Sequence, residues 1–174
     1  MSPQGAAAPR QLMDKGPRIV VDIAGIEVTA DPAQTLITYA LGSCIAVTLF
    51  DPGLRLGGMI HYMLPLSSTS PEKAAVKPGM FADTGVPLLF EKMYALGSQK
   101  KDLVVKVAGG GKIYEDKGRF DIGRRNHTIL RKLFWKNKVL VASEDVGGSK
   151  SRTVSLDVGS GLVLVKSGGE VREL

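Results

Sequence analysis

From Arg18 onward, short runs rich in β-branched and apolar residues alternate with clusters of turn residues. Runs of this kind, bounded by Gly, Pro, Asn or Asp, are typical of β-strands. The segments predicted as strands are "RIVVDI", "IEVTA", "CIAVTLF", "GGMIHYMLP", "DLVVKVAGGG", "KVLVAS" and both halves of "RTVSLDVGSGLVLVK". The last segment predicts a hairpin, because two β-branched runs flank a Gly-Ser-Gly turn.

Two stretches have the period of a helix instead. The first has Asp83 or Thr84 as a possible cap, Gly97 as a stop, and apolar residues at helical spacing: Val86, Leu89, Phe90, Met93 and Leu96. The second runs from Asn126, the predicted cap, to about Lys136. Between strands and helices, "LSSTSPEKAAVKPGMF" is typical of a loop. Many strands with about two helices predict an α/β fold of mixed sheets with the helices on one side.

Composition places these elements in one domain. The 174 residues are 44% hydrophobic and 23% charged, as in an ordinary globular domain. We predict a disordered N-terminal tail over residues 1–17, which lack periodicity, and a single domain over residues 18–174. One cysteine excludes an internal disulfide framework, and no Cys/His cluster has zinc-site spacing. No apolar run approaches a membrane span or a signal peptide, so we expect a cytoplasmic protein without direct membrane insertion.

The excess positive charge is concentrated in one segment, Lys112 to Lys138. Nine Lys or Arg side chains there stand against three acids, which gives +6, the formal charge of the whole chain. A basic patch of this kind indicates either an acidic protein partner or nucleic acid. A solvated helix face is the simpler interpretation, since charge runs usually have that role.

The candidate chemistry lies in the lone cysteine, Cys44, and the first histidine, His61. Alternation places Cys44 on the face of its strand opposite the bulkier apolar residues. If the two residues Pro52 and Gly53 form the hairpin loop, Asp51 pairs with Leu54, and the same register sets Cys44 directly opposite His61. An imidazole at that distance can take the thiol proton, and the backbone N–H groups after Gly42 can hold an oxyanion. A small buried thiol beside a core histidine is the alternative.

Five segments together resemble CheD, the bacterial chemoreceptor glutamine deamidase family. They are "YALGSCIAVTLFDP", "GGMIHYMLP", "FADTGVPLLFEKM", "FDIGRRN" and "DVGGSKSRTVSLDVGSGLVLVK", in order over about residues 20–166. The resemblance implies a sandwich-like core of mixed β-sheets flanked by helices, as in the cytotoxic necrotizing factor deamidases. It also implies a catalytic set of Cys44, His61 and Thr38. From its sequence alone, Thr38 would be an ordinary strand threonine.

The implied activity is that of a protein-glutamine glutaminase, which converts glutamine side chains of methyl-accepting chemotaxis receptors to glutamate and ammonia. In that reaction Cys44 is the nucleophile, His61 the acid–base group and Thr38 the acceptor of the other ring N–H. The N–H groups of Ser43 and Cys44 would stabilise the oxyanion, with no metal or organic cofactor required.

The resemblance also implies a protein partner. Family members bind the CheC phosphatase, so a mainly non-enzymatic module that stimulates CheC is an alternative function. Thiol–imidazole chemistry is equally compatible with a cysteine hydrolase acting on peptide bonds or other acyl groups. The basic segment is compatible with a nucleic-acid-binding domain, although we expect no nucleic acid as a partner.

Overall fold

The structure is a computed structural model that describes residues 9, 13, 16–112 and 120–174. Most of the predicted tail, residues 1–17, lies outside the described residues, as does part of the basic segment. Met13, which is described, is buried against Ile37 and Leu164. Whether the remainder of the tail is disordered stays a prediction.

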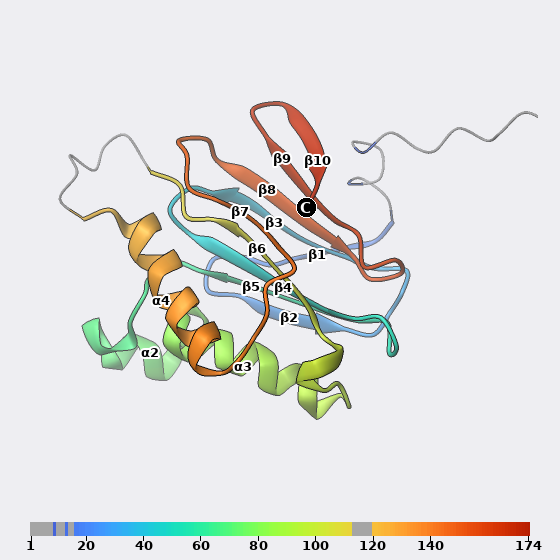
Figure 1. The fold of residues 1–174 in the computed structure, drawn as a ribbon, viewed down its shortest axis with the longest axis horizontal. Coiled ribbons are helices and arrows are strands. Elements are labelled where there is room, and N and C mark those ends of the chain that lie inside the picture. Colours follow the sequence, from blue (N-terminus) through green and yellow to red (C-terminus); the bar gives the residue numbers. More distant parts are fainter. Residues whose placement is uncertain (1–8, 10–12, 14–15, 113–119) are drawn as a thin grey trace, which may run out of the picture.

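Ten described strands form two five-stranded sheets (Figure 1). The outer sheet has the order β1-β3-β8-β9-β10, with β1 at Arg18–Val20, β3 at Thr35–Leu41, β8 at Arg152–Asp157, β9 at Val163–Ser167 and β10 at Glu170–Glu173. The central sheet has the order β2-β5-β4-β6-β7, with β2 at Ile26–Thr29, β5 at Leu56–Tyr62, β4 at Ile45–Asp51, β6 at Val104–Gly109 and β7 at Ser143–Val146. Both sheets mix parallel and antiparallel pairs, as predicted.

Three described α-helices lie on one side of the central sheet (Figure 1). They are α2 at Pro71–Val76, α3 at Ala82–Ala95 and α4 at Ile122–Lys136. Short 3₁₀ turns lie at Ser67–Thr69, Pro78–Met80 and Lys100–Asp102. None of the helices among the described residues is both long and apolar enough to cross a bilayer.

The molecule therefore has three layers, and the central sheet is covered on both faces. Ile45, Val47 and Leu49 of β4 face α3 and α4, in a core that also contains Leu89 and Phe134. The alternate residues of β4 face the outer sheet in a second core. All seven residues of β4 and all seven of β5 are consequently buried. A strand covered on both sides needs apolar residues on both faces, which explains the continuous hydrophobic runs in this part of the sequence.

Several local predictions were wrong. The predicted loop at residues 66–81 contains α2. Neither Asp83 nor Thr84 caps α3, which begins at Ala82; the Asp83 carboxylate instead accepts hydrogen bonds from the backbone and hydroxyl of Ser67. Residues 138–142 of the predicted strand "KVLVAS" are irregular, and β7 begins only at Ser143. The strand β10 was not predicted.

The start of α4 also differs from the prediction. The helix begins at Ile122, four residues before Asn126, and its cap is Asp121, whose carboxylate accepts a hydrogen bond from the Arg124 N–H. An aspartate fills this position as well as an asparagine, because both offer the oxygen that a cap needs. The side chain of Asn126 is therefore free for another contact.

A candidate catalytic site between the sheets

Cys44 lies just before β4, where the chain leaves the ladder of the central sheet. Its thiol is free and partly exposed, and it packs at the margin of the core between the two sheets. Two neighbouring carbonyl groups are held by the glycine turn after β6. The N–H of Gly111 donates to the Gly42 carbonyl at 2.7 Å, and the N–H of Gly110 donates to the Cys44 carbonyl at 2.8 Å. The backbone around the thiol is thus fixed by hydrogen bonds rather than by strand pairing.

His61 lies on β5, and Thr38 faces it from β3 of the outer sheet. The Thr38 hydroxyl donates to the Val21 carbonyl at 2.6 Å and lies 2.8 Å from His61 Nδ1. A hydroxyl has one hydrogen, so the bond to Val21 requires that Thr38 accept from His61. The proton of a neutral ring is therefore on Nδ1, and Nε2 carries the lone pair. Within the described part of the chain, Nε2 has no hydrogen-bond partner, although His61 is only 2% exposed.

A β-bulge accompanies this contact. The register between β3 and β8 shifts between Thr38 and Leu41, and Ala40 within the shift has a φ of 55°. Bulges re-aim side chains and are frequent beside functional sites. Here the irregularity directly follows the residue that holds the imidazole.

The predicted register between Cys44 and His61 was wrong by two residues. Asp51 pairs with Leu56, and Ala46 is the residue opposite His61. The loop has four residues because Pro-Gly favours turn types that do not suit a two-residue hairpin. A shift of two leaves side chains on the same face. If the ladder continued by one residue, Cys44 would be a diagonal neighbour of His61, and Cβ atoms in such pairs are separated by up to about 7 Å.

Burial favours the neutral form of both side chains. Burial raises the pKa of the Cys44 thiol, and the residue's own backbone N–H lowers it in part. Burial lowers the pKa of the His61 imidazole, whereas the Asp22 carboxylate and the Val21 carbonyl raise it in part. A thiol and a neutral imidazole are the correct starting forms for general-base catalysis, in which the proton moves as the nucleophile attacks.

Asn126 also lies beside Cys44, although its sequence position predicted only a helix cap. Its side chain is fully buried, and its Nδ2 donates to the Ser43 carbonyl at 2.9 Å and to the Met63 carbonyl at 3.0 Å. Its backbone carbonyl accepts a hydrogen bond from the Tyr62 hydroxyl at 3.0 Å. Only the position of Asn126 within the "FDIGRRN" segment could have drawn attention to it.

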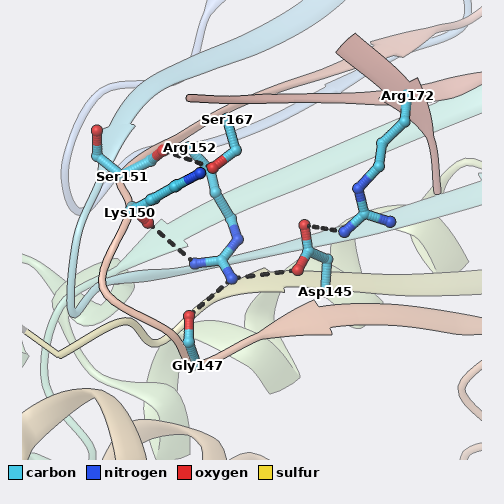
Figure 2. Close-up of polar contacts among 7 residues, drawn as sticks. All are labelled: Asp145, Gly147, Lys150, Ser151, Arg152, Ser167 and Arg172. Carbon is cyan, nitrogen blue, oxygen red and sulfur yellow. Dashed lines mark hydrogen bonds and ion pairs between the residues drawn. The ribbon is translucent and has the colours of Figure 1, made fainter. Parts of the chain in front are cut away.

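Sequence analysis missed Arg152, because "GGSKSR" has the composition of a polar turn. Its guanidinium is only 7% exposed and donates to Asp145 at 3.1 Å and to the Gly147 carbonyl at 2.7 Å (Figure 2). Asp145 also pairs with the exposed Arg172 at 2.6 Å. Since Asp145 is on the central sheet and both arginines are on the outer one, these ion pairs join the two sheets.

The turn held by Arg152 reaches the thiol through the backbone. The Gly148 carbonyl accepts a hydrogen bond from Lys112, the residue after Gly111. A hollow of about 250 Å³ lies beside this turn, lined by Gly110, Lys112, Asp121, Arg124, His127 and residues 146–148. A cavity of about 290 Å³ lies elsewhere, between α3 and α4. No group of three or more metal-ligating side chains is gathered in the ranges that the structure describes.

The fold and the site together define a class of protein: an α/β two-sheet scaffold with a threonine-bound imidazole on one strand and a free thiol just before the neighbouring strand. Comparison with known proteins then gives the family. The family model described as CheD chemotactic sensory transduction matches residues 63–167. This chain belongs to the CheD family.

Curated relatives match beyond that range. A protein of Syntrophus aciditrophicus named "Probable chemoreceptor glutamine deamidase CheD 1" is 52% identical over 157 residues, which is 90% of this chain and 98% of the relative. The "Probable chemoreceptor glutamine deamidase CheD 2" of Anaeromyxobacter dehalogenans is 53% identical over 156 residues, with the same coverage. The "Probable chemoreceptor glutamine deamidase CheD" of Solibacter usitatus is 45% identical over 157 residues, 90% of this chain and 93% of the relative. These matches confirm the resemblance seen in the sequence.

Proposed function

We propose that this protein hydrolyses the side-chain amides of specific glutamines in chemotaxis receptors, producing glutamate and ammonia. The names of its relatives support the activity and the class of substrate. The observation that carries the mechanism is the bond between Thr38 and His61 Nδ1, which leaves the Nε2 lone pair free on the face that Cys44 shares. A base must be in that tautomer to accept a thiol proton.

In the first half of the reaction, His61 Nε2 takes the thiol proton as Cys44 Sγ attacks the amide carbon. The carbonyl oxygen becomes an oxyanion, which the backbone N–H groups of Cys44 and Ser43 stabilise. Neither N–H donates a hydrogen bond to another of the described residues, so both are available. The C–N bond then breaks, the imidazolium protonates the leaving nitrogen, and ammonia departs from a thioester.

In the second half, water attacks the thioester carbonyl and gives a proton to His61. The C–S bond breaks, the glutamate carboxyl group forms, and the thiol regains its proton. Thr38 accepts the Nδ1 hydrogen throughout and so stabilises the imidazolium when it forms, as a neutral orienting group. Apart from the substrate and water, all the groups that act in the two halves of the reaction belong to this chain.

The exposed face of α4 supports recognition of an acidic receptor surface. Its solvent-exposed charged side chains are all basic: Arg124, Arg125, Arg131, Lys132 and Lys136. Such a surface speeds the encounter with a partner of opposite charge. The helix borders the site, since Asn126 on its buried face contacts the backbone beside Cys44.

Product analysis tests this function. The protein and its Cys44→Ala variant are incubated with receptor cytoplasmic domains, and glutamine conversion is mapped by mass spectrometry with ammonia measured in parallel. We expect conversion of particular glutamines by the wild type only. Cleavage of the receptor chain would instead indicate a protease, and conversion by a folded Cys44→Ala protein would refute the thiol mechanism.

The same variant separates catalysis from the second role that the resemblance implies, binding of a CheC-type phosphatase in the cytoplasm. We expect Cys44→Ala to lose deamidation and still bind the phosphatase. If wild-type protein binds the phosphatase but converts no receptor glutamine, the non-enzymatic alternative is correct.

A further inference from the structure

We propose that Asn126 is a positioning residue for the oxyanion site, which turns the peptide group between Ser43 and Cys44 so that its N–H faces the substrate. The inference rests on the proposed function, because it assigns a task within the thiol mechanism. It is carried by the hydrogen bonds of a buried side chain on a helix that supplies none of the predicted catalytic residues.

The first step is the orientation of one peptide plane. The described peptide bonds are all trans, and in a trans peptide the C=O and the N–H point in opposite directions. Asn126 Nδ2 holds the Ser43 carbonyl at 2.9 Å, toward α4. The N–H of Cys44 must therefore point away from α4.

The second step is the bridge to the histidine strand. The β4–β5 ladder ends at the pair Ile45 and Tyr62, so the chain up to Cys44 and the chain from Met63 onward have no ladder bond between them. The second Nδ2 hydrogen of Asn126 binds the Met63 carbonyl at 3.0 Å. One amide thus joins the segment that carries the thiol to the segment that follows the imidazole, in place of the missing ladder bonds.

The orientation of the Asn126 amide leaves one of its polar atoms without a partner among the described residues. Both contacts are carbonyl acceptors, so they require the NH₂ end of the amide. The Oδ1 end is then buried and has no hydrogen-bond partner among the described residues. Leaving such an acceptor unsatisfied is unfavourable. In return, the two donated hydrogens bind the Ser43 and Met63 carbonyls, which an apolar side chain of the same shape would leave without this donor.

Two variants test the role. Asn126→Ala removes both donors. Asn126→Asp keeps the shape of the side chain, but its protonated form has one hydrogen to donate instead of two. Asn137→Ala is the matched control, because Asn137 ends the same helix and is exposed, and its side chain donates to no described group other than the Leu133 carbonyl. Thermal unfolding establishes that each variant is folded.

The decisive measurement compares two reactions of the same thiol. Glutamine hydrolysis passes through an oxyanion, whereas alkylation of Cys44 by iodoacetamide does not. With a receptor fragment as substrate, we expect kcat of both Asn126 variants to fall about 10- to 100-fold with KM unchanged, because misdirecting a donor costs less than the 10²–10³-fold loss on removing one. We expect alkylation to fall much less, and Asn137→Ala to behave as wild type.

Two results would overturn the inference. One is an unchanged kcat in a folded Asn126 variant. The other is a parallel loss of hydrolysis and alkylation, which would mean that Asn126 only keeps the thiol in place. Cys44→Ala, measured alongside, keeps the two proposals apart: if it abolishes hydrolysis while the Asn126 variants retain it, the proposed function survives and the role of Asn126 does not.

Discussion

Replacing Thr38 by valine tests the hydrogen bond that fixes the histidine tautomer. Valine has nearly the same shape as threonine but no hydroxyl, and Thr38 is fully buried. The change removes the acceptor for His61 Nδ1 and the donor to the Val21 carbonyl. It leaves both of those groups unpaired in the interior, which costs about 1–3 kcal/mol each.

We therefore expect the free energy of unfolding of Thr38→Val to fall by about 2–4 kcal/mol, since some relaxation reduces the sum. The effect on catalysis follows from the imidazolium that forms during the reaction. A hydrogen bond to a charged group is worth about 1.5–3 kcal/mol, and each 1.4 kcal/mol is tenfold in rate, so kcat should fall about 10- to 100-fold. The Nδ1 proton would also lose its fixed position, and the unproductive tautomer would become populated.

Urea unfolding and ammonia release with a receptor fragment measure the two effects. Thr48→Val is the matched control, because Thr48 is a buried threonine of β4 whose hydroxyl has only a 3.5 Å contact with the Lys106 carbonyl. Thr38→Ser should retain activity, since it keeps the hydroxyl. An unchanged kcat in folded Thr38→Val, or an equal loss in Thr48→Val, would refute the role given to Thr38.

Four further predictions follow from burial and charge. Because burial lowers the pKa of His61, the value of kcat/KM should fall only when the pH drops below the ordinary histidine pKa of about 6.5. If the midpoint of this fall lies above that pH, His61 is not a buried base. The same lowered pKa means that His61 binds a proton more readily in the unfolded chain than in the folded protein. The free energy of unfolding should therefore decrease as the pH drops below about 6.5. His61→Gln should remove this part of the dependence of stability on pH. Salt should slow turnover of the receptor while leaving a small neutral glutamine peptide little affected, and equal sensitivity of both would refute steering by the basic face of α4. Arg152→Met should destabilise the protein by about 1.5–3 kcal/mol in urea unfolding, because it removes the buried partner of Asp145 and leaves only the exposed Arg172. Arg172→Gln should cost about 1 kcal/mol or less, and similar losses for the two variants would show that burial does not set the difference.

The sequence predicted the architecture well, for a reason visible in the central sheet. A strand covered on both faces must be mainly apolar, so β4 and β5, which are buried along their whole length, appear as largely hydrophobic runs. The prediction of which side chains of β4 share a face was also correct, because side chains of a strand alternate between its two faces whatever the strand pairs with. Segments with weaker patterns were predicted poorly: α2 is a short helix with no buried residue, and β7 is largely polar.

Within the site, the sequence provided the residue types, and the tertiary structure decided their contacts. Cys44 and His61 were assigned to one face of a hairpin because local spacing determines that face, but the register depended on a loop conformation that spacing does not fix. Thr38 meets His61 across the gap between two sheets, and no sequence period links residues in separate sheets.

Asn126 shows the same limit. Its sequence context suggested a helix cap, and only the packing of α4 against the central sheet brought its amide to the carbonyls of Ser43 and Met63. Local patterns determine which way a side chain points along its own element. Which groups it meets depends on how distant elements pack, and the closely packed interior allows few arrangements.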